Sequence, residues 1–233
     1  MKTIAFVIAL MATGSAYAAD LPASPTQTHG VYYQTPQYNW GGLYVGINGG
    51  YGFGTSSWTG PTGATGNFAV RGPLAGGTAG LNWQMANGLV FGIEADGDWA
   101  SLEGNSSNAL CSAATAGATC ETRTNVLVTG RGRLGYAFQR VLLYGTAGAA
   151  WSGIAAGLKP PGTYDSTFDL GWTAGGGLEY AIGEQWTAKI EYLYVDLGVT
   201  QCQSANCGAG VPFGVPLVEN LVRAGVNFRF APW

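Results

Sequence analysis

The chain has 233 residues, of which 10% are charged and 39 are glycine, and its formal net charge is −3. Soluble globular domains carry about 25% charged residues and about 7% glycine, so this composition argues against an ordinary soluble domain. The acidic balance argues against a nucleic-acid partner. The many aromatic and branched aliphatic residues argue against disorder.

The amino terminus is predicted to be a secretory signal peptide. Lys2 supplies a positive charge, residues 4–12 form a short apolar core, and Ala16-Tyr17-Ala18 is a small-residue cleavage site. The apolar core is too short to cross about 30 Å of hydrocarbon, and no later segment offers about 20 unbroken apolar residues. Membrane insertion would therefore use strands. We expect a signal peptide at 1–18, a flexible periplasmic lead-in at 19–39, and an outer-membrane β-barrel domain at 40–233.

Eight segments with period-two alternation follow the lead-in. In the first, Leu43, Val45 and Ile47 share one face, whereas Gly46 and Gly50 share the other. Strict alternation of this kind predicts strands with two unlike faces. The expected strands are 40–54, 74–85, 89–99, 125–137, 141–151, 170–182, 186–196 and 218–230.

The connections between these segments alternate in length. Short turns are expected at 86–88, 138–140 and 183–185, and long links at about 55–71, 100–124, 152–167 and 197–217. Short and long links around an even number of strands are typical of outer-membrane barrels. We therefore predict an all-β fold, an eight-stranded antiparallel transmembrane β-barrel with short periplasmic turns and long extracellular loops.

The distribution of charge predicts which face points outward. The charged residues of the strands share the glycine and threonine face, while the other face is apolar and bounded by aromatics near both ends. An apolar band bounded by two belts of aromatic residues is typical of a surface that faces a bilayer. A soluble, lipocalin-like barrel is the rival interpretation, but it would need a large internal cavity for the aromatic face. The expected aromatic girdle is Trp83, Tyr136, Tyr180 and Trp186 near the turns, and Phe53, Trp99, Trp151 and Tyr194 near the loops.

The inward face is expected to hold a network of ion pairs. Eight strands leave an interior that side chains can fill, and isolated buried charges would be too costly. A selectivity filter is the alternative, although a filter more often carries a ring of one sign. The expected network comprises five acids and five bases: Glu94, Asp96, Asp98, Arg131, Arg133, Glu179, Lys189, Glu191, Arg223 and Arg229.

The four cysteines form two local pairs within the long links. Cys111 lies near Cys120, and Cys202 lies near Cys207. In an oxidising compartment each pair is expected to form a disulfide. Metal binding is the rival interpretation, but the spacings lack the usual C-x2-C form and no histidine lies nearby; free thiols are the third possibility.

Catalytic and cofactor motifs are weak. Residues 130–135 match G-x-G-x-x-G, but they lie inside a predicted strand with no helix after it, so no cofactor is expected. The single histidine, His29, falls in the lead-in, which leaves the barrel without a histidine-based hydrolytic site. Glu94, Asp96 and Asp98 could act as acids or bases, but nearby arginines favour ion pairing. We predict that the protein is not an enzyme.

Several segments resemble the small, immunogenic, porin-like outer-membrane barrels of alphaproteobacteria. They are NWGGLYVGINGGYGFG at 39–54, GRGRLGYAF at 130–138, GWTAGGGLEYAIGEQWTAKIEYLYVDLG at 171–198, VRAGVNFRF at 222–230, and ADLP at 19–22. The resemblance covers most of the mature chain. It implies an eight-stranded outer-membrane barrel with a role in envelope integrity and surface exposure, sometimes with modest pore activity, and no catalytic residues.

One departure concerns the carboxyl terminus. Barrels of this kind usually end at an aromatic residue that the insertion machinery recognises. Phe230 would be this residue, and Phe228 would precede it on the same face of the strand. This chain continues to Trp233. Either Trp233 takes over as the terminal aromatic or the signal is read internally.

The expected function is that of a structural, surface-exposed outer-membrane protein with a lumen filled by side chains. The alternatives are a narrow porin-like channel for small solutes and an adhesin or ligand receptor that binds through its loops. The expected partners are outer-membrane lipid, lipopolysaccharide and the barrel insertion machinery, with a monomer favoured and no metal.

Overall fold

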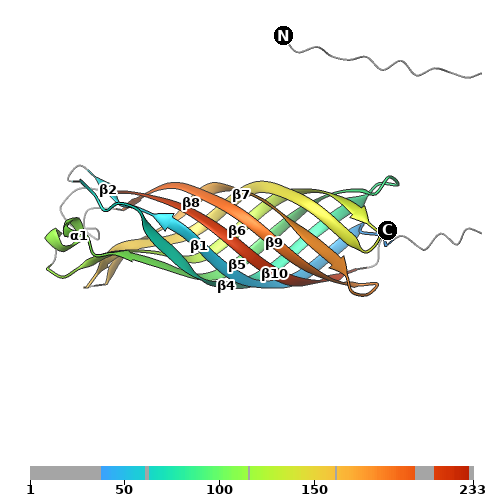
Figure 1. Cartoon of the computed structure of the whole chain (residues 1–233), viewed down its shortest axis with the longest axis horizontal. Helices are drawn as coiled ribbons and strands as arrows, with labels where there is room; N and C mark the ends of the chain where they lie inside the picture. The colour runs from blue at the N-terminus through green and yellow to red at the C-terminus, as the bar shows by residue number, and fades with distance from the viewer. Residues whose placement is uncertain (1–37, 61–62, 115, 161, 203–212, 231–233) are drawn as a thin grey trace, which may run out of the picture. The chain divides into compact units, whose positions relative to one another are not determined.

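Eight long strands form a closed antiparallel ring in the computed structural model (Figure 1). It describes residues 38–60, 63–114, 116–160, 162–202 and 213–230, all within the unit Pro36–Trp233. The strands are β1 (Gly42–Ser56), β4 (Phe68–Gln84), β5 (Leu89–Ser106), β6 (Thr119–Phe138), β7 (Val141–Lys159), β8 (Thr163–Ala181), β9 (Trp186–Cys202) and β10 (Phe213–Arg229). Pairing of β1 with β10 closes the ring, with Gly50 opposite Arg223.

The two ends of the barrel differ in their connections. At one end the strands are joined by tight turns, such as the one that Gly88 completes with a φ of 87°. At the other end lie the short strands β2 (Thr59–Gly60) and β3 (Gly63–Ala64) and the helix α1 (Ala109–Ala114). The helix begins after Asn108, whose side-chain Oδ1 accepts a hydrogen bond from the Leu110 amide at 3.1 Å.

The strands are longer than the sequence pattern predicts. β5 has 18 residues and β6 has 20, whereas we expected strands at 89–99 and 125–137. Much of the long links at 100–124 and 152–167 is therefore strand. In β6 the pairing register shifts around Asn125. Odd-numbered residues such as Thr129 and Leu127 point inward on one side of this position, and Thr124, an even-numbered residue, points inward on the other. Such a bulge breaks the alternation from which the strand would have been recognised.

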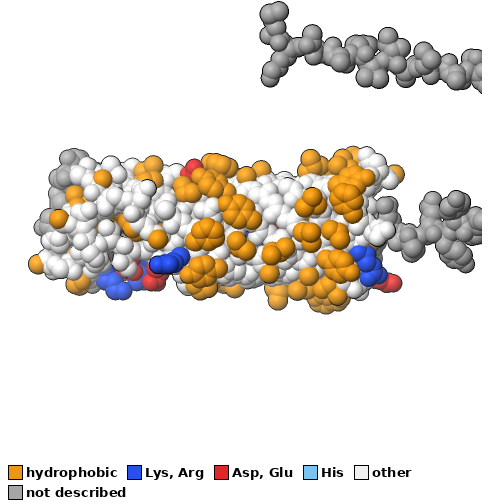
Figure 2. Space-filling model, in the orientation of Figure 1, with side chains coloured by type: hydrophobic (Ala, Val, Ile, Leu, Met, Phe, Trp, Pro, Cys, Tyr) orange, Lys and Arg blue, Asp and Glu red, His pale blue; other side chains and the backbone are white. Residues whose placement is uncertain are grey.

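The outer face is apolar and the inner face is charged. The expected aromatic residues all lie on the outer face; Trp99 is 78% exposed, and Tyr194 is partly covered by Trp172. Figure 2 shows hydrophobic side chains gathered over the middle and the turn end of the visible face. Among the described residues, no helix is long and apolar enough to cross a membrane.

Glycines on the inner wall allow the strands to approach one another closely. A Cβ atom at Gly50 would lie 2.2 Å from the Val222 carbonyl oxygen, and one at Gly54 would lie 2.0 Å from the Val218 carbonyl oxygen. Outward-facing Gly97 has no such neighbour within 4 Å. The inner glycines are therefore required by the curvature of a narrow barrel.

Replacing Gly50 with Ala is expected to destabilise the barrel, because the added methyl group would collide with backbone atoms that have little room to move. We expect a loss of about 1–3 kcal/mol, measured as a lower unfolding midpoint in detergent micelles. Gly97→Ala is the matched control and should leave the midpoint nearly unchanged. Equal midpoints for the two variants would contradict the close-packing argument.

Candidate functional site

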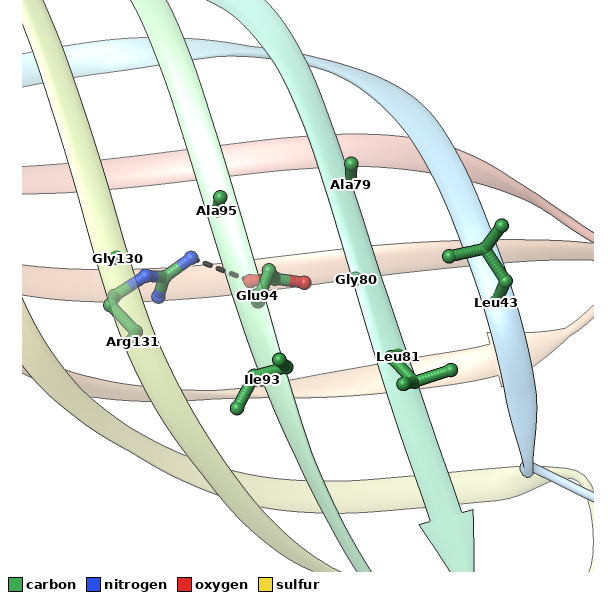
Figure 3. A pocket seen from close by; sticks show the side chains of 9 residues that line it. All are labelled: Leu43, Ala79, Gly80, Leu81, Ile93, Glu94, Ala95, Gly130 and Arg131. Carbon is green, nitrogen blue, oxygen red and sulfur yellow. Dashed lines mark hydrogen bonds and ion pairs between the residues drawn. The ribbon is translucent and has the colours of Figure 1, made fainter.

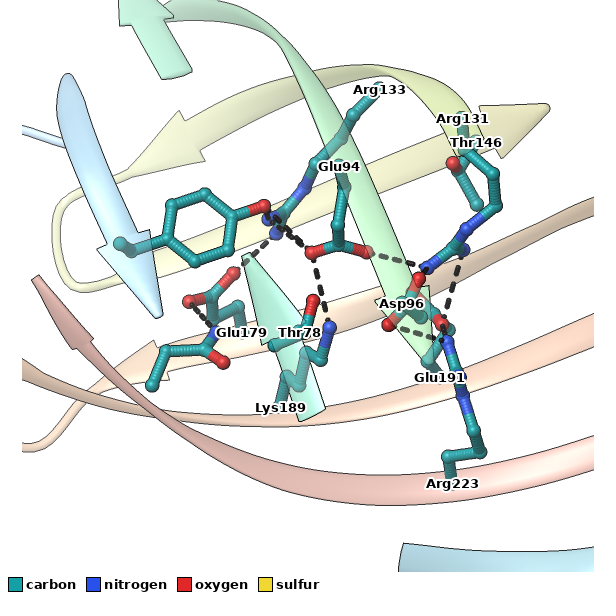
Figure 4. A network of polar contacts seen from close by, with 12 residues as sticks. Thr78, Glu94, Asp96, Arg131, Arg133, Thr146, Glu179, Lys189, Glu191 and Arg223 are labelled. Atoms are coloured by element: carbon teal, nitrogen blue, oxygen red, sulfur yellow. Dashed lines mark hydrogen bonds and ion pairs between the residues drawn. The ribbon is translucent and has the colours of Figure 1, made fainter. Parts of the chain in front are cut away.

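The inner wall holds a network of ion pairs around Arg131 (Figure 4). The Arg131 guanidinium lies 2.6 Å from a Glu94 oxygen, 2.5 Å from an Asp96 oxygen and 3.2 Å from a Glu191 oxygen. All four side chains are at most 1% exposed. Thr129 also donates a hydrogen bond to Asp96 at 3.0 Å. Each buried charge in this group therefore has at least one partner of opposite charge.

Arg223 extends the network across the lumen. Its guanidinium nitrogens lie 2.6 Å from Asp98, 3.2 Å from Asp96 and 2.5 Å from Glu191. Arg131 and Arg223 thus share Asp96 and Glu191, which lie between them in Figure 4. Because β5, β6, β9 and β10 each contribute a member, the network joins strands that are not neighbours in the sheet.

A second group of charges lies nearer the short turns. Arg133 forms an ion pair with Glu179, and its guanidinium is 3.7 Å from the centre of the Tyr144 ring. Glu94 connects this group to the first, because its Oε2 atom accepts hydrogen bonds from Lys189 at 3.1 Å and from the Tyr44 hydroxyl at 2.7 Å. Tyr44 and Tyr144 were not predicted as members of the network. Their positions in β1 and β7 nevertheless have the inward parity of the charged residues.

Arg229 differs from the prediction. It is buried, but no described carboxylate lies within ion-pair distance of it; its guanidinium donates to the Gly41 carbonyl at 2.6 Å and lies over the Tyr38 ring at 4.7 Å. Tyr38, which we expected in the flexible lead-in, packs against Trp40. Arg229 lies at the turn end of β10 beside the rings of Tyr38 and Trp40, and cation–π contact with these rings takes the place of the expected ion pair.

Apolar side chains pack on both sides of the ion pairs along the barrel. Nearer the turns, Trp40, Val90 and Leu142 belong to one buried cluster. On the loop side, the next inward positions after the charged residues are apolar, as with Leu193 after Glu191. This second cluster consists of Val70, Leu74, Ala100, Leu102, Leu127, Ala150, Ile154, Leu193, Val195, Leu197, Leu217 and Leu221.

Glu219 is a buried acid that the sequence analysis missed. It is completely buried; its Oε1 atom accepts a hydrogen bond from Thr124 at 2.5 Å, and its Oε2 atom has no hydrogen-bond partner. No described base lies within ion-pair distance of it. Its position has the same parity as Arg223, so the alternation of β10 already placed it inside. It adds a fully buried inward acid to the five that were expected.

The loop end of the barrel is covered by a third buried cluster. Trp58 is fully buried, packs against Phe213, and donates from its indole nitrogen to Thr122 at 3.1 Å. Cys111 of α1 and Cys120 of β6 form a disulfide. The expected partner of Cys202, Cys207, lies outside the described residues.

A hollow of about 640 Å³ lies on the outer wall (Figure 3). The exposed side chains of Leu43 and Ile93 line it, and Ala79 leaves room between them. Glu94 and Arg131 also contribute to its lining, but their side chains are buried in the lumen and bonded to each other. The hollow therefore belongs to the apolar outer surface and not to the ion-pair network.

Chemistry other than ion pairing has little support in the described part of the chain. No group of three or more His, Cys, Asp or Glu side chains there is arranged to hold a metal ion. His29 lies outside the described residues. The three carboxylates considered as acid–base groups, Glu94, Asp96 and Asp98, all contact arginines.

The sequence matches the outer membrane protein beta-barrel domain over residues 6–230. The chain belongs to this family. It is 34% identical to the 31 kDa outer-membrane immunogenic protein of Brucella melitensis, over 99% of this chain and all of that protein. It is also 27% identical to a 22 kDa outer membrane protein of Rhizobium leguminosarum, over 84% of this chain and 80% of that protein.

Solved structures support the fold. The outer membrane protein OprG from Pseudomonas aeruginosa superposes with a TM-score of 0.50 at 11% identity, over 83% of this chain and 99% of that one. Members of this family are integral outer-membrane proteins, so the barrel spans the outer membrane with its short turns toward the periplasm. Phe228 lies near the end of β10 and Phe230 directly follows this strand, both on the outer side. Trp233 lies outside the described residues.

Replacing Arg131 with Met should destabilise the barrel strongly, because it removes the partner that Glu94, Asp96 and Glu191 share. Breaking a buried ion pair by deleting one member costs about 3–5 kcal/mol. The free energy of unfolding in detergent micelles measures the effect. Arg140→Met, at an exposed turn position, is the control and should change it by less than about 0.5 kcal/mol.

Glu219→Gln should behave differently from a substitution in the network. Glutamine keeps the shape of the side chain and leaves no cation without a partner, so we expect unchanged or higher stability in the same unfolding measurement. A loss as large as that of Arg131→Met would contradict the view that Glu219 stands apart from the ion pairs.

Proposed function

We propose that this protein is a structural, surface-exposed barrel of the outer membrane whose lumen is filled by side chains, and that it contributes to envelope integrity. The observation that carries the proposal is the succession of buried layers along the barrel. Apolar clusters lie on either side of the ion-pair network, and a further cluster around Trp58 covers the loop end. A stack of this kind leaves little room for a hydrated path.

Surface exposure is supported by the relatives. The Brucella proteins are named immunogenic outer-membrane proteins, and immune recognition of a barrel in intact cells requires loops that face outward. The loop end of this chain carries α1, β2 and β3 as well as the disulfide between Cys111 and Cys120. We infer a role in the envelope for the barrel, with no catalytic activity, because its candidate acids are held in ion pairs.

A narrow pore is the second candidate, and one observation favours it. The buried Asn48 amide faces Asp98, and neither its two polar atoms nor the Oδ1 atom of Asp98 has a hydrogen-bond partner outside this pair. Buried polar atoms of this kind are commonly satisfied by internal water. Water beside the ion pairs would provide part of a hydrated path through the lumen. The apolar layer that contains Leu193 and Leu221 would still interrupt this path.

The wild-type protein should give no reproducible stepwise openings in planar lipid bilayers. Leu193 and Leu221 face each other across neighbouring strands in the apolar layer. Replacing both with Ala should create only brief openings of low conductance, because it removes bulk from the apolar layer while the clusters around Trp40 and Trp58 still narrow the lumen. Ile190→Ala, on the outer face of β9, is the control and should remain silent.

Wild-type openings that vanish when Arg131 or Glu94 is neutralised would contradict the filled lumen and establish the narrow pore instead.

A strain that lacks the protein should take up a hydrophobic fluorescent dye faster and become more sensitive to detergent, because the proposed role is to maintain the barrier. Expression of the wild type or of Ile190→Ala should restore the barrier, whereas a variant that does not reach the membrane should not. Dye uptake identical in the two strains would contradict a role in envelope integrity, whatever the conductance result.

A further inference from the structure

A row of charged side chains lies on the outer wall above the ring of aromatics at the loop end. Arg71 of β4 pairs in register with Glu103 of β5, which pairs with Arg123 of β6. Glu121 of β6 and Lys159 of β7 continue it, with 4.0 Å between the lysine nitrogen and the carboxylate. We call these five residues the outer charged row.

The row lies outside the apolar band of the wall. On β5, Glu103 comes four residues beyond Trp99 toward the loop end, and on β7, Lys159 comes eight residues beyond Trp151. Aromatic rings of this kind mark the boundary between hydrocarbon and headgroups. The outer charged row therefore faces sideways at the level of the headgroups and sugars of the outer leaflet, not upward into the medium.

The centre of the row is internally neutralised. Arg123 donates to one Glu121 oxygen at 2.9 and 2.8 Å, lies 3.7 Å from Glu103, and stacks on the Tyr164 ring at 5.0 Å. Burial raises the pKa of Glu121, but hydrogen bonds from Tyr164 and Arg123 outweigh it, so the pKa is lowered overall. Glu121 is thus a carboxylate at neutral pH, and its charge is committed to Arg123.

The two ends of the row are basic and accessible. Arg71 is exposed, and no described carboxylate lies within ion-pair distance of it. The Lys159 side chain is 58% exposed and reaches only the outer limit of ion-pair distance to Glu121. The row holds three bases and two acids. Its uncompensated positive charge therefore lies at Arg71 and Lys159.

We propose that the outer charged row binds anionic groups of the lipopolysaccharide that surrounds the barrel in the outer leaflet. Arg71 offers a planar fork that suits phosphate or carboxylate, and Lys159 offers a second point of positive charge. Arg71 lies in register with Phe53 of the aromatic girdle, and Lys159 lies farther out along β7. Both side chains lie on the outer wall, at the level of the headgroups and of the sugars, and this position favours a lipid-borne anion over a soluble one. This proposal depends on the outer-membrane location but not on whether the lumen conducts.

Retention of rough lipopolysaccharide by the purified full-length protein in neutral detergent micelles tests the proposal, with native mass spectrometry as the measurement. A base near an anionic lipid surface contributes about 1 kcal/mol, or about fivefold in affinity. Arg71→Gln should therefore lower retention about fivefold, and Arg71→Gln with Lys159→Gln about 25-fold. Arg140→Gln, which removes an exposed base at the periplasmic turn, is the matched control and should retain the wild-type amount.

A variant that removes an acid, where the others remove a base, distinguishes lipopolysaccharide binding from ion pairing within the row. Glu103→Gln removes an exposed acid and makes the row more positive, so retention should rise about twofold or more. Mutual ion pairing as the row's sole role would leave retention unchanged in every variant, and that result would overturn the proposal. Heat-modifiable migration on a gel verifies that each variant has folded.

Competition identifies the source of the anion. Added inorganic phosphate or heparin at equal charge concentration should displace little lipopolysaccharide, because neither also contacts the apolar wall. Displacement at low concentration by either would overturn the assignment to a lipid and indicate a site for a soluble anion.

Discussion

The structure depends on the mutual neutralisation of charges that are held inside the barrel. Arg131 and Arg223 share Asp96 and Glu191, and Glu94 connects them to Lys189 and Arg133. Each of these groups would be too costly to bury alone. Because the partners come from strands on different sides of the ring, the network acts as a cross-link through the lumen. It holds the wall together where the outer surface can contribute only contact with lipid.

The rest of the barrel is arranged around this layer. Long arginine and glutamate side chains can fill the interior only where the facing wall is thin, and glycines such as Gly50 provide that wall. Apolar side chains then occupy the inward positions beyond the charges, and Trp58 and Phe213 cover the loop end. On the outside, leucine, isoleucine and aromatic side chains contact the hydrocarbon, and charges reappear only where the headgroups begin. The result is a protein in which polar and apolar regions are stacked along the barrel as well as divided between its two faces.

Much of this could be predicted from the sequence, because a barrel in lipid imposes a strict period of two. The alternation of Leu43, Val45 and Ile47 with glycines predicted the first strand and its two faces, and the family comparison supports the eight-stranded fold. The ends of the strands could not be predicted, since the bulge at Asn125 reverses the inward parity and the outward residues beyond it are no longer uniformly apolar. Arg229 has the parity of the network, but its height within the barrel places it beside Tyr38 and Trp40. Parity predicts the face on which a side chain lies; its partners also depend on the stagger between strands, which the sequence does not display.

Hydrogen exchange of the arginine guanidinium groups tests most directly whether the charged layer is sealed from water. The wild-type barrel, reconstituted in lipid bilayers, would be transferred to D2O and followed by NMR, with exposed Arg71 and Arg140 as internal references. Burial within the network predicts that the guanidinium signals of Arg131 and Arg223 persist long after those of the references have disappeared. Exchange of Arg131 and Arg223 as fast as that of Arg71 would contradict a filled lumen, because it would show that water reaches the ion pairs freely.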